Sequence, residues 1–238
     1  MSKDTENPKV TGTVEEAFTG IYQHQRWGRG AWSGEGSDPT RLERYIRLLQ
    51  QFIRERGITS VVDLGCGDWQ FSRQIDWSGV NYIGIDVVPT LIQQLNTNYA
   101  RNGVCFVHGN VVTCDLPAAD LAISKDVLQH LPNELVLQFL GRLRRFKYAI
   151  LTNDRKQYYP SWRDVWNFRR VYMTVPNSEI STGGYRPIRL REPPFNLKAH
   201  ELLRLKMWHR YGVHLKEVLL WENKEMTYFS KSGNRKLF

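Results

Sequence analysis

Cysteine is scarce in this sequence, with three residues, Cys66, Cys105 and Cys114, in a chain of 238. Their number is odd and no two of them have Cys-x-x-Cys spacing, which argues against both a disulfide framework and a zinc site. Each cysteine is therefore expected to be a small buried residue rather than a nucleophile. A reducing, cytoplasmic setting and no metal are expected on the same grounds.

Long apolar runs are also missing. No stretch approaches 18 apolar residues, so no membrane span is expected. The polar start, MSKDTENPK, lacks the apolar core of a secretory signal and is typical of a loose tail. The remaining chain, with 41% hydrophobic and 12% aromatic residues overall, suffices for one domain with a sizeable core and extensions.

Acidic residues are few in one part of the chain. Residues 142–191 hold twelve Lys or Arg and three acids, a surplus of nine positive charges that equals the net charge of the whole chain. A basic segment this concentrated attracts phosphate or carboxylate groups, or forms a solvated basic face. The sequence leaves both interpretations open.

The first 57 residues differ in composition from the rest. Gly, Trp and Ser crowd residues 19–40 without any period, which predicts a long loop. Apolar residues then recur at helical spacing from Leu42 to Ile53, and Gly57 ends that predicted helix. We therefore expect residues 1–57 to form a tail, a Trp/Gly-rich loop and a leading helix before a domain at 58–238.

Short β-rich runs alternate with helical ones through the next hundred residues. The expected strands are Ser60–Asp63, Tyr82–Asp86, Val104–His108, Leu121–Ser124 and Tyr148–Thr152. The expected helices lie near Trp69–Ile75, Thr90–Tyr99 and Glu134–Phe146. Continuous apolar strands alternating with helices predict an α/β fold whose mostly parallel sheet is covered on both faces.

This alternation lapses after Thr152. Residues 153–197 are interpreted as a basic, lid-like insertion, and a helix is expected around His200–Arg210. Two further runs, His214–Trp221 and Met226–Ser230, are separated by Glu-Asn-Lys-Glu. That spacing predicts a closing antiparallel hairpin.

The turn after the first expected strand is the predicted ligand site. It reads Asp-Leu-Gly-Cys-Gly over residues 63–67, and glycines at such a turn let a ligand lie against the backbone at the carboxyl end of the strand. The third glycine of a dinucleotide fingerprint is missing, because position 70 is Gln, and no Walker loop follows. An acid before the glycines repels a pyrophosphate and suits a ligand that carries positive charge.

Asp-Leu-Gly-Cys-Gly resembles the first motif of class I S-adenosylmethionine (SAM)-dependent methyltransferases, and an ordered set of similar motifs covers roughly residues 58–152. The resemblance implies a Rossmann-like, mostly parallel seven-stranded sheet with helices on both faces and a C-terminal antiparallel hairpin. It also implies SAM as the cofactor. The implied cofactor-binding residues are Asp63, Gly65, Cys66, Gly67, Trp69, Asp86, Val87, Asn110, Val111 and Lys125.

Within that resemblance two residues have defined tasks. Asp86 is expected to accept hydrogen bonds from both ribose hydroxyls, because a carboxylate has two acceptor oxygens. Asn110 is expected to accept a hydrogen bond from the adenine amino group through its side-chain oxygen.

The sequence also departs from the family pattern at two places. Position 69 is Trp where many members have a third glycine, and this side chain either narrows the pocket or packs under the first helix. Residues 124–127 replace the Asn-Pro-Pro-Tyr-type motif of many enzymes that methylate nucleobase amines.

Methyl transfer is an in-line displacement that depends on alignment and desolvation, and a base helps when the acceptor is a hydroxyl or a protonated amine. The candidate bases are Asp126, His130 and Asp154, each beyond a strand end, although each also has a structural alternative as a cap, a turn or an ion-pair residue. The candidate substrate-binding residues are Trp27, Tyr185 and Arg186, the last two beside a Gly183-Gly184 hinge.

Three functions remain open at this point. The first is methylation of an oxygen or nitrogen on a small-molecule or glycan acceptor, with an anionic acceptor accounting for the arginines. The second is an RNA or protein methyltransferase that uses residues 142–191 as its electrostatic footprint. The third is a non-catalytic protein that binds SAM.

Overall fold

The computed structural model describes residues 12–27, 33–158, 175–209 and 212–226. The helices are α1 (Val14–Gln23), α2 (Glu43–Glu55), α3 (Pro89–Tyr99) and α4 (Asn133–Arg142). The strands are β1 (Ser60–Leu64), β2 (Asn81–Asp86), β3 (Val104–His108), β4 (Ala119–Lys125), β5 (Phe146–Tyr158), β6 (His200–His209) and β7 (Gly212–Glu222). Short 3₁₀ turns lie at Glu35–Ser37, Pro39–Arg41, Ser72–Gln74, Leu128–His130 and Leu143–Arg145.

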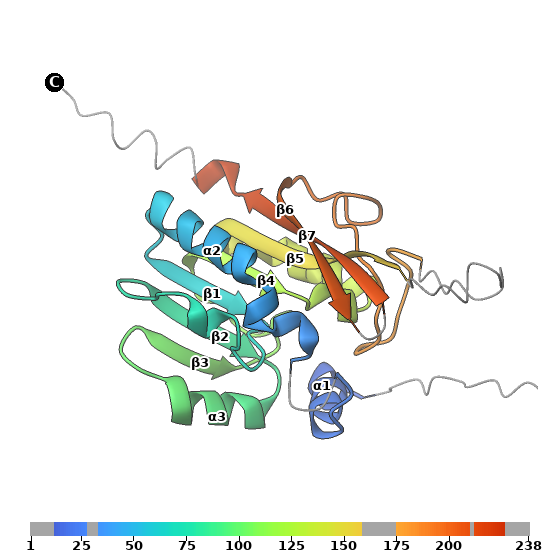
Figure 1. Ribbon diagram of the computed structural model, residues 1–238, viewed down its shortest axis with the longest axis horizontal. Coiled ribbons are helices and arrows are strands. Elements are labelled where there is room, and N and C mark those ends of the chain that lie inside the picture. Colours follow the sequence, from blue (N-terminus) through green and yellow to red (C-terminus); the bar gives the residue numbers. More distant parts are fainter. Residues whose placement is uncertain (1–11, 28–32, 159–174, 210–211, 227–238) are drawn as a thin grey trace, which may run out of the picture.

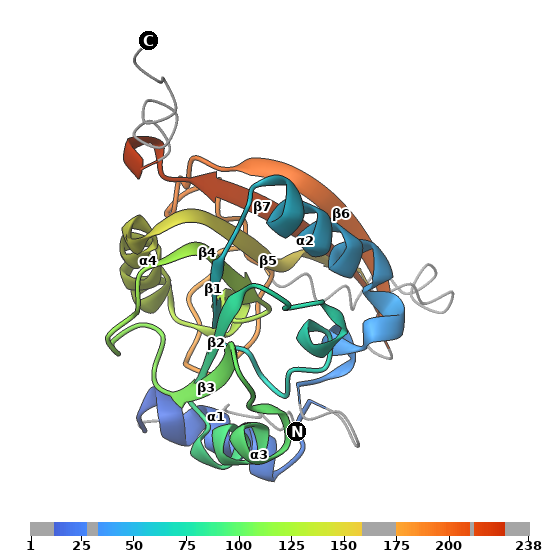
Figure 2. The ribbon, with the colours of Figure 1, turned by 90° about the vertical axis from the view of Figure 1, so that its left-hand side faces the viewer.

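The strands form one seven-stranded sheet in the order β3-β2-β1-β4-β5-β7-β6. The pairs among β1 to β5 are parallel, whereas β7 runs antiparallel to both β5 and β6. Helices α2 and α4 lie on opposite faces of the sheet (Figure 2). This is the expected Rossmann-like arrangement, and the chain order reverses between β1 and β4, where such folds bind ligands.

Each of these four helices buries apolar side chains. In α2 the buried residues recur at helical spacing (Tyr45, Ile46, Leu49, Phe52 and Ile53). Helix α1 begins at a capping box, in which Thr13 and Glu16 each satisfy the other's backbone N–H, and it buries Phe18 and Ile21. Both helices join the same apolar core as the strands. In Figure 1, α1 lies beyond the arrowheads of β1 to β3, at the carboxyl edge of the sheet.

The five parallel strands agree with the sequence prediction, but three other predictions were wrong. Residues 19–23, expected in a loop, complete α1. The helix expected near Trp69–Ile75 is only the 3₁₀ turn Ser72–Gln74. The helix expected around His200–Arg210 is strand β6, because its buried side chains Leu205 and Met207 alternate with exposed ones, and a period of two fits a strand.

The closing hairpin is present, but its partner strands differ from those expected. Residues 214–221 lie in β7 as predicted, and they pair with β6 rather than with a later strand. Met226 lies in a helical turn, and the rest of the predicted run to Ser230 falls outside the described residues, as do residues 1–11 of the N-terminal tail.

The strand assignment of β6 makes a mutational prediction. Leu205 is buried and Leu202 is 36% exposed on the opposite face of the strand. Leu205→Ala should therefore cost about 2–5 kcal/mol of unfolding free energy, whereas Leu202→Ala should cost less than about 1 kcal/mol. Urea denaturation measures both values. Equal large losses would indicate a helix, in which residues three apart share one face.

Candidate functional site

One cavity lies at the carboxyl edge of the sheet. It encloses about 720 Å³, its open mouth included. Its floor comes from the turns after β1, β2, β3 and β4, and its cover comes from α1, Trp27 and residues 33–37. The lining residues are Val14, Phe18, Tyr22, Trp27, Ser33, Ser37, Gly65, Cys66, Gly67, Phe71, Asp86, Val87, Asn110, Val111, Val112, Lys125, Asp126, Val127 and Leu131. This set contains most of the site residues expected from the sequence.

The glycine turn after β1 is packed too closely for side chains. Gly65 and Gly67 both have positive φ, at 83° and 55°. A Cβ on Gly65 would lie 2.3 Å from Val127 Cγ2, and one on Gly67 would lie 2.3 Å from Ser33 Oγ. Glycine at both positions thus allows the cover and the segment after β4 to close onto the turn.

The cover is bound to this turn by polar contacts. Asp68 N–H donates to Ser33 Oγ over 2.8 Å, and Ser33 N–H donates to Asp68 Oδ2 over 3.2 Å. Ser33 Oγ also lies 2.9 Å from the hydroxyl of Tyr22, which comes from α1. The N-terminal segment therefore completes the cavity wall, a role that the loop prediction did not anticipate.

Asp86 and Asn110 stand where the second and third strands end. Asp86 accepts a hydrogen bond from Gly67 N–H on Oδ2 and from Val88 N–H on Oδ1. Burial raises the pKa of Asp86, while these backbone donors oppose the increase. Asn110 Oδ1 accepts from Val112 N–H over 2.9 Å. Each of these oxygens keeps a second lone pair for a ligand.

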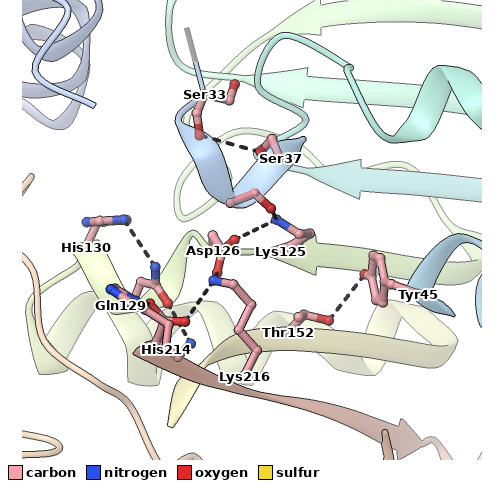
Figure 3. A network of polar contacts seen from close by, with 12 residues as sticks. Ser33, Ser37, Tyr45, Lys125, Asp126, Gln129, His130, Thr152, His214 and Lys216 are labelled. Atoms are coloured by element: carbon pink, nitrogen blue, oxygen red, sulfur yellow. Dashed lines mark hydrogen bonds and ion pairs between the residues drawn. The ribbon is translucent and has the colours of Figure 1, made fainter. Parts of the chain in front are cut away.

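Four charged groups are connected by hydrogen bonds where β4 ends, and Figure 3 labels three of them, Lys125, Asp126 and Lys216. The fourth is Asp154 on β5. The Lys125 ammonium donates to Gly36 O over 2.7 Å and to Asp126 Oδ2 over 2.6 Å. The Lys216 ammonium donates to Asp126 Oδ1 over 2.6 Å and to Asp154 Oδ1 over 2.8 Å. Two ammonium groups thus balance two carboxylates, and the neighbouring lysines lower the pKa of Asp126 and of Asp154.

His130 lies behind the cavity wall. Its Nδ1 is 2.7 Å from Gly184 O, so Nδ1 carries the proton and Nε2 is the acceptor in the neutral ring. Its ring centroid is 5.1 Å from that of Trp27, which does line the cavity. Burial lowers the pKa of His130, which favours the neutral form at pH 7.

Two expected site residues lie in the core instead. Asp63 accepts hydrogen bonds from Ser72 and Tyr82, and burial raises its pKa to about 6. Trp69 packs its ring among Tyr82, Tyr99 and Phe106. Neither residue lines the cavity, because β1 turns the carboxylate inward and the positive φ of Trp69 directs the indole into the apolar core.

Arg186 does not fit the substrate contact expected of it. Its side chain is fully buried and donates to Leu128 O, Leu131 O and Asn133 Oδ1, at 2.8, 2.8 and 3.0 Å. Those contacts connect the insertion to the segment after β4. The neighbouring Tyr185 is only partly buried, and its hydroxyl donates to Asp154 Oδ2 over 2.9 Å, so the insertion reaches the charged cluster through Tyr185.

Several arginines of the basic segment are bound within the protein. Arg142 donates to Val112 O over 2.7 Å and Arg145 donates to Leu116 O over 2.8 Å. Further along, Arg189 pairs with Glu192, and Arg191 pairs with Glu201 and Glu217. These side chains stabilise loops. Arg163, Arg169 and Arg170 lie outside the described residues.

In the described part of the chain, no group of three or more His, Cys, Asp or Glu side chains is arranged to hold a metal ion. None of the helices in the described ranges is long and apolar enough to cross a bilayer. Cys66 is buried, as expected, whereas Cys105 is exposed and Cys114 is intermediate.

Sequence reasoning missed about half of the cavity lining. It missed Val14, Phe18 and Tyr22, because α1 was not predicted. It also missed Lys216, which contacts the lining residue Asp126, because β7 was interpreted only as a hairpin strand. The apolar spacing of Ala17, Phe18 and Ile21 was a usable signal for α1. A lysine within the apolar run of residues 213–221 was a signal for Lys216, since a buried lysine needs an anionic partner.

Comparison with known proteins agrees with this geometry. Residues 61–147 match the family model described as a methyltransferase domain. A ubiquinone biosynthesis O-methyltransferase from Rickettsia felis is 23% identical over 136 residues, which cover 54% of this chain and 56% of that protein. The chain therefore spans just over half the length of this curated relative.

Solved structures share the fold at low sequence identity. A 1,6-didemethyltoxoflavin-N1-methyltransferase from Burkholderia thailandensis, with bound S-adenosylhomocysteine, superposes with a TM-score of 0.56 at 15% identity and covers 88% of each chain. A magnesium protoporphyrin IX methyltransferase from Synechocystis PCC 6803, with the same ligand, gives 0.54 at 14% identity and covers 87% of this chain and 96% of that one.

The sheet order, the cavity at its carboxyl edge and the matched family model together define a class of protein. Residues 61–147 match a methyltransferase domain, and the chain has the fold of the class I SAM-dependent methyltransferases. The ligands bound in the two solved neighbours support SAM as its cofactor.

The close packing at Gly67 predicts how a substitution there affects SAM. Gly67→Ala should weaken SAM binding at least about tenfold, because the added methyl displaces Ser33 and strains a positive φ. Gly79→Ala is the matched control, since Gly79 also has positive φ but an added Cβ meets nothing within 4 Å. Isothermal titration with SAM should therefore give the wild-type affinity for the control. Equal losses in both variants would indicate that backbone strain, rather than contact with the cover, is responsible.

Proposed function

We propose that this protein transfers a methyl group from SAM to an oxygen or nitrogen of a small-molecule acceptor. The observation that supports this most is the single cavity in which the glycine turn, Asp86, Asn110 and Asp126 share one wall beneath the cover. SAM supplies the methyl group on a positively charged sulfur. The wall carries two carboxylates, Asp86 and Asp126, against one ammonium, Lys125, a balance that suits a cationic ligand.

The cofactor roles follow from where each residue stands. The backbone at Gly65 and Gly67 is open to the cavity and suits the methionyl portion. Asp86 lines the cavity and retains acceptor capacity for a ribose diol, since its two oxygens together have about four lone-pair sites. Asn110, with the apolar side chains Val111 and Phe18 nearby on the wall, suits the adenine ring.

Asp126 is the candidate base that contacts the acceptor. It lines the cavity, whereas His130 lies behind Trp27 and Asp154 lies beyond Lys216. A carboxylate at this point accepts a hydrogen bond from an acceptor O–H or N–H and thereby orients the attacking lone pair. The proton that the new methyl group replaces then leaves toward this carboxylate or toward solvent.

The charge of the site favours an acceptor without negative charge. The two lysines of the cluster are both bound to carboxylates, and the described arginines named above are bound to carbonyls or glutamates. The aromatic and aliphatic lining, which includes Tyr22, Trp27, Val127 and Leu131, suits a compact organic acceptor. These contacts weigh against the anionic acceptor and the nucleic acid that the net charge alone suggested.

Isotope-labelled SAM tests this function directly. The purified protein is incubated with a host-cell extract, which is then separated into small-molecule, glycan, RNA and protein fractions. Label should appear in the small-molecule fraction and disappear with Asp86→Ala. Label confined to RNA or protein would contradict the proposed acceptor class, and no label despite measurable SAM binding would favour a non-catalytic protein.

Asp126→Asn should lower the turnover of the labelled acceptor by about 100-fold, because the amide carries no charge to draw an acceptor proton. The SAM dissociation constant should stay within about threefold of the wild-type value. Asp76→Asn is the matched control, since that aspartate lies in an exposed loop away from the site and should leave turnover unchanged. Full activity of Asp126→Asn would remove Asp126 from the mechanism.

A further inference from the structure

Lys216 lies on β7, the antiparallel strand that follows the whole insertion, yet its ammonium reaches the end of β4. It donates to Asp126 Oδ1 and to Asp154 Oδ1, and its side chain is only 2% exposed. A buried ammonium is costly unless it is paired, and here both partners are carboxylates. The residue thus joins the cavity wall to a second group of side chains.

That second group contains Asp154, His214 and Tyr185. Asp154 Oδ2 lies 2.6 Å from His214 Nδ1 and accepts from the Tyr185 hydroxyl over 2.9 Å. On the other side, Lys125 connects Asp126 to Gly36 O of the cover. The exposed fractions differ along this chain of contacts, because Asp126 is 16% exposed whereas Lys216 and Asp154 are each 2% exposed. Of Asp126, Lys216 and Asp154, Asp126 is therefore the one that lines the cavity.

We propose that Lys216 is a positioning residue for methyl transfer, one that holds the Asp126 carboxylate charged and oriented toward the acceptor. This inference rests on the proposed function for its catalytic meaning. The backbone of Asp126 has a φ of 60°, and its N–H donates to Thr152 O, so the peptide is fixed from β5 while Lys216 fixes the side chain from β7. Lys125 holds the other carboxylate oxygen from β4.

The charges around Asp126 determine what removal of Lys216 does. The facing groups are Lys125 on β4, Lys216 on β7, Asp154 on β5, His130 in the turn after β4, and Tyr45 on α2. The two lysines lower the pKa of Asp126, whereas burial and Asp154 raise it. Removal of Lys216 takes away one of the two positive charges that lower the pKa of Asp126, while burial and Asp154 still raise it. The pKa of Asp126 therefore rises, and activity on the acid side of the pH profile falls.

A carboxyl titration tests this without any acceptor. The protein is prepared with ¹³C-carboxyl aspartate, and the Asp126 signal is assigned by its loss in Asp126→Asn. In the wild type Asp126 should stay ionised from about pH 5 to 8, whereas in Lys216→Met its midpoint should rise by about 1–3 pH units. Lys206→Met, on the exposed face of β6, is the control and should leave the midpoint unchanged. An unshifted midpoint in folded Lys216→Met overturns the proposal.

If Lys216→Met does not fold, Lys216→Met with Asp154→Asn removes one charge of each sign and is titrated in its place. The midpoint should still rise, by less, because the repulsion from Asp154 is also gone. A midpoint at the wild-type value in this folded pair would equally overturn the proposal.

The turnover rates of single and double variants distinguish a positioning role of Lys216 from a purely structural one. The double variant Asp126→Asn with Lys216→Met should be no slower than Asp126→Asn alone, within about twofold, because Lys216 acts through Asp126. If the double variant instead loses turnover by the product of the two single-variant losses, the proposal is contradicted. Label in no fraction with the wild type would refute the proposed function instead, and the carboxyl titration would still decide the role of Lys216.

Discussion

The site depends on a turn that has no room for a side chain. At Gly65 and Gly67 the backbone lies against Val127 and Ser33 so closely that either Cβ would collide at 2.3 Å. This contact brings together three parts of the chain that are distant in sequence: the cover, the end of β1 and the segment after β4. Because Asp86 also accepts from Gly67 N–H, the same turn positions the carboxylate at the end of β2. The cavity exists because these contacts meet at one place.

Charge balance governs the other end of the cavity. Lys125 and Lys216 are each 2% exposed, and such ammonium groups are tolerated because Asp126 and Asp154 receive their hydrogen bonds. The partners come from β4, β5 and β7, so the antiparallel strand after the insertion becomes part of the site. Through Gly36 O and Tyr185 the same cluster contacts the cover and the insertion. The proposed roles of Asp126 and Lys216 both follow from this arrangement.

The sequence predicted what depends on local pattern and missed what depends on tertiary contact. Strands β1 to β5 are continuous apolar runs, and the glycine turn with Asp86 has a recognisable spacing, so the fold and much of the cofactor wall were predictable. Strand β6 was mistaken for a helix because Leu202 and Trp208 break its alternation with exposed apolar residues. Arg186 was expected at the substrate, because a local sequence pattern does not reveal that its guanidinium is buried and donates to three oxygen atoms of the protein. The cover was missed because α1 is short and gains its order by packing on the glycine turn and on Gly183.

A crystal structure of the protein with S-adenosylhomocysteine is the most direct measurement. We expect the ribose hydroxyls on Asp86, the adenine beside Asn110 and Val111, and the sulfur at the end of the cavity that Asp126 lines, with Ser33 still bound to Asp68. A ligand bound elsewhere, or one whose sulfur points away from Asp126, would contradict it.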